Sequence, residues 1–221
     1  MPHAVVLSHD SIAHELGQLE PWFDRHGFTV TRVYREQPRP LPAADLLVVM
    51  GSPGSAADGA CPPATQSEIA AVGDWVASGR PYLGICFGAQ VLAAATGGSV
   101  RRMATPFNGY VEMDLTPDAP RALDGAWLTW HEDALTAPAS GDVLGRRDHA
   151  DLAFRVGRAW GVQPHVEVTP DSAERMLIAL AVPEIQYGIA LGVMRSHAEG
   201  DAERAAALLD AFLDDTAATR E

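Results

Sequence analysis

The segment Pro81–Gln90 constrains the fold of this chain more than any other. It places an apolar run directly before the pattern Gly84-Ile85-Cys86-Phe87-Gly88, and the helix-forming run Ala89–Ala95 follows. The two glycines allow a sharp turn and a close approach of strand and helix, which lifts the Cys86 side chain out of the backbone. The positive end of the helix would then favour the thiolate of Cys86. This pattern alone leaves two interpretations open, a nucleophile or a structural cysteine.

Short apolar segments alternate with helical ones over the first hundred residues. This alternation predicts an α/β fold with a doubly wound, mostly parallel sheet flanked by helices, whose reactive groups lie beyond the C-terminal ends of the strands. Gly51–Ser55 and Cys86 both follow such ends. The predicted strands are Ala4–Ser8, Phe28–Tyr34, Asp45–Met50 and Tyr82–Ile85, and the predicted helices are Ser11–His26, Glu68–Ser78 and Ala89–Ala95.

The second half of the chain is less regular. Strand-like pieces lie near Tyr110–Leu115, Ala126–Thr129 and Ala159–Val162. Helices are predicted at Ser172–Ala181 and at Asp201–Thr216, the latter with Asp201 as its N-cap. Because no repeat or convincing linker separates these segments, residues 1–221 are predicted to form a single domain.

Composition excludes several classes of protein. A formal net charge of −13, with sixteen arginines and no lysine, argues against binding to a nucleic-acid backbone. Cys61 and Cys86 are the two cysteines, so no disulfide framework is expected. The first ten residues lack the features of a signal peptide, and no apolar run approaches the length of a membrane span. We therefore expect a cytoplasmic protein that does not insert into a membrane.

A cysteine nucleophile needs a base, and eight histidines are available. His165 stands out because it follows the strand-like Ala159–Val162 and is separated by one residue from Glu167. In an extended segment residues i and i+2 point to the same side, so this imidazole and carboxylate can meet directly. A surface histidine beside a solvated glutamate is the alternative interpretation. The other histidines outside the Trp130–Asp133 segment are predicted to lie at the surface or at the edge of the core.

Three segments taken together resemble a known family. They are Pro81–Gln90 with Gly97-Gly98, then Trp130–Asp133, then Trp160–Thr169, in this order and spacing. From Val5 to about Thr169 the chain resembles the class I (triad-type) glutamine amidotransferases, in particular stand-alone members similar to the amidotransferase domain of GMP synthase. The resemblance implies the flavodoxin-like fold of that family.

The resemblance also implies a role for each matching residue. Cys86 would attack the side-chain carboxamide of glutamine, His165 would act as general base and acid, and Glu167 would orient His165. The substrate oxygen would be met by backbone N–H groups of Phe87 and of the Gly51-Ser52 turn. The amino-acid end of the substrate would be held by Gln90, Trp130, His131, Glu132 and Asp133, the last four largely through their backbone.

The chain departs from the family pattern at two places. Gly51-Ser52-Pro53 stands where the family usually has Gly-Gly-Pro, and His165-Val166-Glu167 stands for the usual His-Pro-Glu, with Pro164 in place of an aromatic residue. A second glycine would ease a backbone flip in the oxyanion turn. The charged groups are kept, so the departures concern whether the substrate is free glutamine or a related γ-glutamyl amide or hydrazide.

No metal and no cofactor are predicted. The Trp130–Asp133 segment carries a histidine beside carboxylates, but it lacks the HExxH or cysteine-rich spacing of a metal site. Gly51–Ser55 lacks the glycine patterns of phosphate-binding loops, which favours an oxyanion turn.

Two functions from different classes follow as hypotheses. The first is an enzyme, a glutaminase or γ-glutamyl hydrolase that forms a Cys86 thioester and releases ammonia or an amine plus glutamate. Its partners would be a small-molecule substrate and a separate synthetase or acceptor protein. The second is a binding or regulatory module that keeps the fold with little or no catalysis. Another type of cysteine hydrolase shares the elbow but does not account for the distant Gly-Val-Gln-x-His-x-Glu segment.

Overall fold

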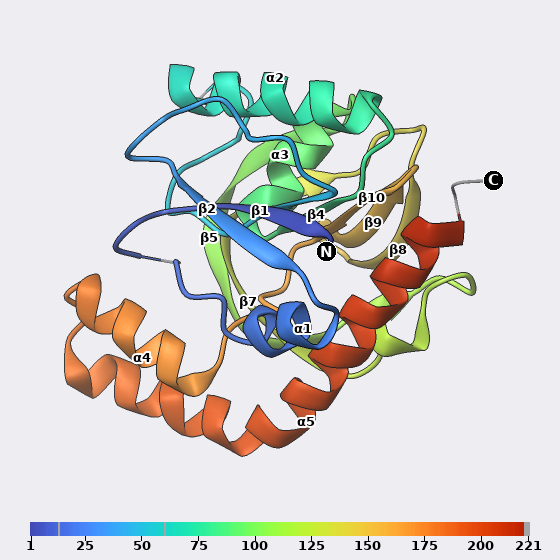
Figure 1. Cartoon of the computed structure of the whole chain (residues 1–221). Helices are drawn as coiled ribbons and strands as arrows, with labels where there is room; N and C mark the ends of the chain where they lie inside the picture. The colour runs from blue at the N-terminus through green and yellow to red at the C-terminus, as the bar shows by residue number, and fades with distance from the viewer. Residues whose placement is uncertain (13, 60, 219–221) are drawn as a thin grey trace.

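An eight-stranded sheet lies at the centre of the computed structural model, which describes residues 1–12, 14–59 and 61–218 (Figure 1). Four neighbouring pairs, β2-β1, β1-β3, β3-β4 and β4-β10, are parallel, and β9, β8 and β6 continue the sheet in antiparallel fashion. The predicted α/β fold with a mostly parallel sheet is therefore confirmed. The strand order is β2 (Thr29–Tyr34), β1 (His3–Ser8), β3 (Leu46–Val49), β4 (Tyr82–Ile85), β10 (Ala159–Val162), β9 (Ala150–Val156), β8 (Asp142–Arg147) and β6 (Asp114–Leu115).

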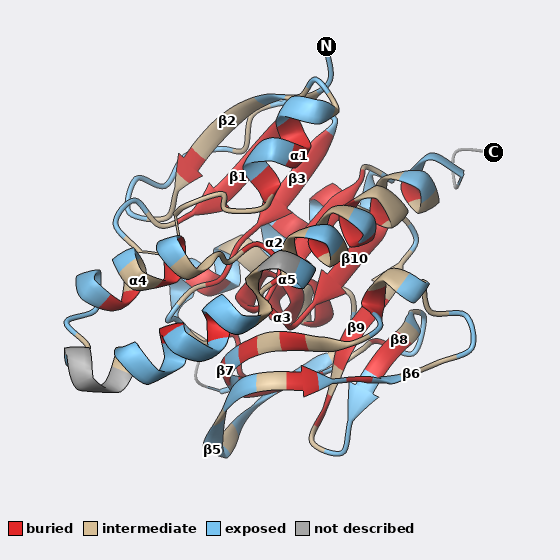
Figure 2. Cartoon of the chain, turned by 90° about the horizontal axis from the view of Figure 1, so that it is seen from below, coloured by how far each residue is buried: buried red, intermediate tan, exposed pale blue. Residues whose placement is uncertain are grey.

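Helices cover both faces of the parallel strands (Figures 1 and 2). On one face, α1 (Leu19–Arg25) and the end of α5 (Glu184–Ala218) form a hydrophobic core with Val6 and Val48. On the other face, α2 (Pro63–Ala77) and α3 (Phe87–Ala95) pack against Val5 and Val49. Because successive residues of one strand are buried on opposite faces, these strands appear in the sequence as continuous apolar runs.

A separate two-stranded ribbon lies beside the main sheet. It pairs β5 (Ser99–Glu112) with β7 (Ala126–Thr136) in antiparallel fashion, and the short helix η1 (Arg121–Leu123) precedes β7. The start of α5 and helix α4 (Pro170–Ala179) share a small hydrophobic core, against which Tyr110 and Leu128 of the ribbon pack. The ribbon thereby joins the end of the main sheet to the helices α4 and α5.

The predicted helix Ser11–His26 is wrong in its first half, since α1 begins only at Leu19. Residue 13 lies outside the described residues. Gly17 adopts φ 50°, and a Cβ added there would lie 1.9 Å from the carbonyl oxygen of Glu167. The next residue, Gln18, donates its backbone N–H to that same carbonyl at 2.8 Å. The segment is thus held against the His165–Glu167 stretch rather than coiled as a helix.

Other differences lie in the second half of the chain. The predicted strand Tyr110–Leu115 is divided between β5 and β6, which belong to different sheets, and the predicted Ala126–Thr129 continues to Thr136. Asp201 is not an N-cap, because α5 begins at residue 184 and Asp201 lies in its interior. Its carboxylate accepts a hydrogen bond from the Tyr110 hydroxyl at 2.8 Å instead.

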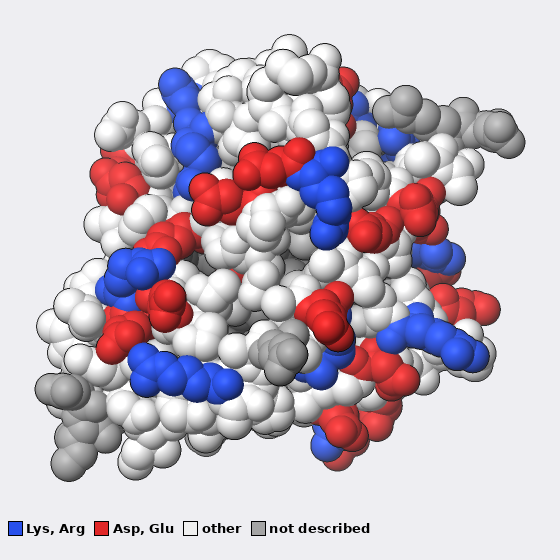
Figure 3. Space-filling model, turned by 60° about the horizontal axis from the view of Figure 1, so that its bottom comes forward, with Lys and Arg blue, Asp and Glu red and all other residues white. Residues whose placement is uncertain are grey.

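Among the described residues, no helix combines the length and the apolar character that crossing a bilayer requires. Arginine and acidic side chains are interspersed over the face shown in Figure 3.

Candidate active site

Cys86 occupies a strained turn between β4 and α3. Its backbone adopts φ 53° and ψ −107°, a conformation that non-glycine residues rarely adopt. A Cβ added to Gly84 would lie 2.4 Å from the Gly88 carbonyl oxygen, and one added to Gly88 would lie 2.0 Å from the Val49 carbonyl oxygen. Both glycines are therefore required by close backbone contacts, and the predicted sharp elbow is present.

The structure brings the three residues of the predicted triad together. The Nδ1 atom of His165 lies 2.9 Å from the Oε1 atom of Glu167, and the His165 backbone N–H donates to the Leu128 carbonyl at 2.8 Å. Gly51 is adjacent to both the base and the thiol, since a Cβ added there would lie 3.2 Å from His165 Cε1 and 3.8 Å from Cys86 Cβ. Cys86 is only 5% exposed and Glu167 only 3%. The roles of these residues remain predictions.

The surroundings of His165 favour its charged form. Burial by itself lowers the pKa of His165, but the negative charges of Cys86 and Glu167 and the hydrogen bonds to them outweigh this effect. The pKa of His165 therefore lies well above its ordinary value. A histidine placed beside a thiol and paired with a carboxylate is an arrangement suited to nucleophilic attack by sulfur.

Two buried glutamines connect the thiol to the interior. The Gln163 side-chain amide donates to the sulfur of Cys86 at 3.4 Å, and its oxygen accepts from the Gln90 amide at 3.2 Å. Gln90 also donates to the Asp133 main-chain carbonyl at 3.3 Å. The Trp130 carbonyl lies 3.6 Å from the sulfur. Sequence reasoning missed Gln163, although it lies within the segment Gly161–Glu167 that was used for recognition.

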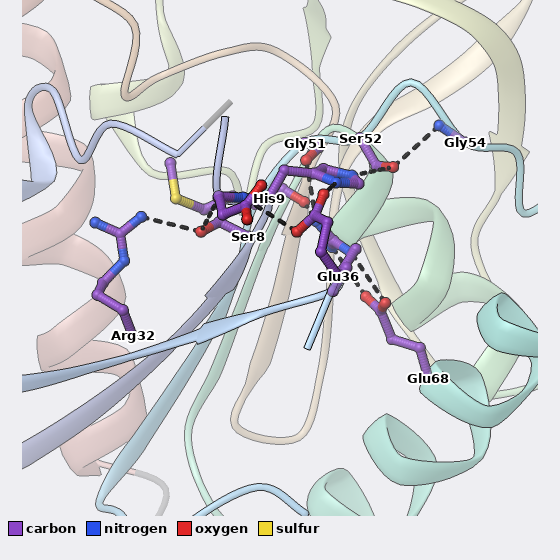
Figure 4. A network of polar contacts seen from close by, with 11 residues as sticks. Ser8, His9, Arg32, Glu36, Gly51, Ser52, Gly54 and Glu68 are labelled. Carbon is purple, nitrogen blue, oxygen red and sulfur yellow. Dashed lines mark hydrogen bonds and ion pairs between the residues drawn. The ribbon is translucent and has the colours of Figure 1, made fainter. Parts of the chain in front are cut away.

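The Gly51-Ser52 turn is held by hydrogen bonds from Arg35, whose partner Glu68 is labelled with Gly51 and Ser52 in Figure 4. Arg35 donates to the carbonyls of Met50 and Gly51, at 3.1 and 3.2 Å, and is itself held by two hydrogen bonds of 2.9 Å to Glu68. A trans peptide directs its carbonyl and its N–H to opposite sides. Because the Gly51 carbonyl points to Arg35, the N–H of Ser52 points away from it.

The Ser52 side chain is held by a second set of contacts (Figure 4). Its hydroxyl lies 2.9 Å from Nε2 of His9 and accepts the Gly54 backbone N–H at 3.0 Å. The Nδ1 atom of His9 in turn bonds to Glu36. A side chain that a second glycine would lack therefore contributes to fixing the turn. Sequence reasoning did not assign any function to His9, Arg35, Glu36 or Glu68, because no motif joins these separated residues.

Most of the predicted site residues line a cavity of about 230 Å³, whereas Glu167 lies behind His165 and is not part of this lining. Arg102, to which sequence analysis assigned no function, is the arginine among the described residues that line it. Phe87, the other predicted oxyanion residue, begins α3 and does not contribute to the lining described. No group of three or more metal-ligating side chains is found among the described residues. The predicted residues that line the cavity are Cys86, His165, Gly51, Ser52, Gln90, Trp130, His131, Glu132 and Asp133.

The Trp130–Asp133 segment lies on β7, with its side chains alternating between exposed and buried. Arg102 of β5 forms ion pairs with both Glu132 and Asp133. The buried His131 bonds through Nδ1 to the Asp133 carbonyl at 2.8 Å, and burial lowers the pKa of His131. His131 is thus bonded within its own strand through Nδ1, and its Nε2 atom is buried without a hydrogen-bond partner among the residues that the structure describes.

A family model described as glutamine amidotransferase class-I matches residues 9–182. The chain belongs to this family. The match covers the elbow, the Trp130–Asp133 segment and the His165–Glu167 pair. It therefore confirms the resemblance that rested on those three segments.

Curated relatives carry the name GMP synthase [glutamine-hydrolyzing]. The protein of Aeropyrum pernix is 34% identical over 136 residues, which cover 58% of this chain and 25% of that protein. The protein of Thermus thermophilus is 40% identical over 99 residues, which cover 41% of this chain and 20% of that protein. The aligned part of the chain thus spans a quarter or less of the length of these relatives.

Solved structures share the whole fold. A glutamine amidotransferase from Thermotoga maritima aligns with a TM-score of 0.83 at 21% identity and covers 100% of this chain and 99% of that one. A glutamine amidotransferase from Methylobacillus flagellatus gives 0.79 at 22% identity, covering 97% and 95% of the two chains. At these identities the comparison supports the predicted family fold and nothing finer.

Proposed function

We propose that this chain hydrolyses the γ-carboxamide of glutamine, or of a related γ-glutamyl amide, through a thioester on Cys86. One observation carries the proposal. Cys86 sits on a strained elbow and lines one cavity together with His165, which is paired at 2.9 Å with the buried Glu167. A thiol, a base and a group that orients the base are the parts that covalent acyl transfer requires.

The proposed reaction has two steps. The thiolate of Cys86 attacks the γ-carbonyl carbon, the C–N bond breaks, and His165 gives its proton to the departing nitrogen. Water then loses a proton to His165 and attacks the thioester, which releases glutamate and regenerates the thiolate. Glu167 keeps the Nδ1 proton of His165 in place, so that Nε2 is the atom that exchanges protons.

Backbone N–H groups of Ser52 and Phe87 are the proposed donors to the oxyanion. Arg35 supports this assignment because its hydrogen bond to the Gly51 carbonyl turns the Ser52 N–H away from Arg35. Phe87 is the first residue of α3, where backbone N–H groups have no partner within the helix. Donors that are fixed before the reaction lower its barrier without reorganisation.

The opposite end of the cavity suits an amino acid. Arg102 offers a cation for the α-carboxylate, and Glu132 offers an anion for the α-ammonium group. Gln90, Trp130, His131 and Asp133 would shape this end, mostly through the β7 backbone. The proposed partner is a separate synthetase or acceptor protein that takes up the ammonia, in keeping with relatives named GMP synthase.

Ammonia release from glutamine tests the proposal. Wild-type protein should turn over glutamine, and Cys86→Ala and His165→Ala should each lose nearly all of that activity. A glutamine-mimicking electrophile should add its mass to wild type and to the matched control Cys61→Ala, but not to Cys86→Ala. A wild-type protein that forms no adduct and releases no ammonia or amine from any γ-glutamyl donor would instead favour the non-catalytic binding module.

A further inference from the structure

A second cavity, of about 320 Å³, lies between the β5–β7 ribbon and the helices α4 and α5. It shares three lining residues, Trp130, His165 and Met176, with the cavity that contains Cys86. His165 therefore borders both cavities. The family match, the relatives and the residues predicted from sequence assign nothing to the second one.

Three backbone carbonyls along strand β7 contact three different parts of the site, in the order Gln90, Cys86 and His165. The Asp133 carbonyl meets Gln90 at the amino-acid end, and the Trp130 carbonyl lies 3.6 Å from the Cys86 sulfur. Further back along the strand, the Leu128 carbonyl accepts the His165 backbone N–H at 2.8 Å, and Leu128 itself lines the second cavity. A γ-glutamyl group held at Gln90 would thus direct its departing nitrogen toward His165. A substituent on that nitrogen would continue into the second cavity.

The lining of the second cavity selects for apolar groups. No arginine, aspartate or glutamate is found among its described lining residues. The Tyr110 hydroxyl is already engaged by Asp201 at 2.8 Å. Moving a charged group into such surroundings is costly, whereas an apolar group gains from leaving water. Its apolar lining includes Leu128, Val168, Leu177, Val182, Val193 and Met194.

We propose that this second cavity holds the amine side of the substrate, and that the chain prefers γ-glutamyl amides of neutral, apolar amines. The inference rests on the proposed function. The reaction balances as γ-glutamyl-NHR plus water giving glutamate plus the amine. The C–N bond breaks after attack by Cys86, His165 protonates the nitrogen, and the group R remains in the apolar cavity until the amine leaves.

A series of γ-glutamyl N-alkylamides, from methyl to hexyl, tests this inference in the wild-type protein. The kcat/KM for glutamate release should rise by about fourfold for each methylene that enters the cavity. Hydrolysis of glutamine with a flat or falling dependence on alkyl length would overturn the inference and leave the proposed function standing. No turnover of glutamine or of any amide would overturn the proposed function as well.

A pair of neighbouring residues on α5 gives a matched test by substitution. Both residues are exposed, but Ala190 lines the second cavity, whereas Ile189, which is 75% exposed, is not among the lining residues. Ala190→Trp should lower the ratio of hexylamide to glutamine kcat/KM by tenfold or more, and Ile189→Trp should leave that ratio unchanged. Thermal melting of both variants checks that each is folded. An unchanged ratio in folded Ala190→Trp would count against the assigned cavity.

Discussion

Removing the guanidinium of Arg35 should affect both stability and catalysis. The Arg35 and Glu68 side chains are 12% and 10% exposed and are joined by two hydrogen bonds of 2.9 Å. Arg35→Met would leave the Glu68 carboxylate buried without its partner, which should lower the free energy of unfolding by about 3–5 kcal/mol. The carbonyls of Met50 and Gly51 would also lose their donor.

The double variant Arg35→Met/Glu68→Met separates the two effects. Replacing both members of a buried ion pair with apolar residues is often neutral or stabilising, so most of the lost stability should return. The Gly51-Ser52 peptide would still lack its support. Loss of one oxyanion donor reduces kcat by roughly 100- to 1,000-fold. In the double variant the Ser52 N–H is still present but is free to turn away from the substrate oxygen, so kcat should fall by less, about 10- to 100-fold.

Urea unfolding and steady-state glutamine hydrolysis are the two measurements. The matched control is Arg195→Met, which removes an exposed ion pair with Glu174 and should change stability by no more than about 1 kcal/mol. A double variant with wild-type stability and wild-type kcat would refute the idea that Arg35 holds the oxyanion peptide. A single variant as stable as wild type would refute the reasoning about the buried pair.

Three further predictions concern the elbow, the base and the substrate end. Gly88→Ala should lower the free energy of unfolding by about 1–3 kcal/mol or prevent folding, because the new Cβ meets the β3 backbone. The control Gly192→Ala on α5 places its Cβ where nothing lies within 4 Å, so it should be neutral or stabilising. Urea unfolding measures both variants. Glu167→Gln should lower the pKa of His165 in an NMR titration and reduce kcat by about 10³- to 10⁴-fold. Because the fold raises the pKa of His165, the stability that Glu167 provides is fully present below pH about 6.5 and is lost as the pH rises through the raised pKa. The loss of stability caused by Glu167→Gln should therefore shrink as the pH rises. A loss that grows with pH would contradict this assignment. Arg102→Met should raise KM for glutamine while kcat changes little, and an unchanged KM would argue against a role in binding the substrate.

The parts of the site that the sequence predicts depend on short-range geometry. The glycines around Cys86 lie within two residues of it, and the His165–Glu167 pairing needs only the two-residue repeat of extended chain. The alternation of strands and helices likewise predicts which strand ends face one another. Such rules act within a few residues, so they can be applied before any tertiary contact is known.

The supporting residues depend on contacts that no short-range rule describes. Arg35 reaches Glu68 across 33 positions of sequence, and Arg102 reaches Asp133 across 31. Arginines scattered singly or in pairs through an acidic chain are most simply interpreted as surface residues. The packing of α2 against the sheet brings Arg35 to the Gly51 carbonyl, and the pairing of β5 with β7 brings Arg102 to the cavity.

The helix predicted from Ser11 is wrong before Leu19 because this segment, together with His9 before it, contacts the Glu167 and Ser52 segments of the candidate site. Residues 11–18 carry a helical pattern, but Gly17 and Gln18 contact the Glu167 carbonyl, and His9 just before them bonds to the Ser52 hydroxyl. A helix through this segment would replace these contacts with solvent-facing turns. Tertiary contacts thus override the helical preference of this segment where it and His9 contact the Glu167 and Ser52 stretches. Rules based on sequence alone are expected to fail at such functional sites.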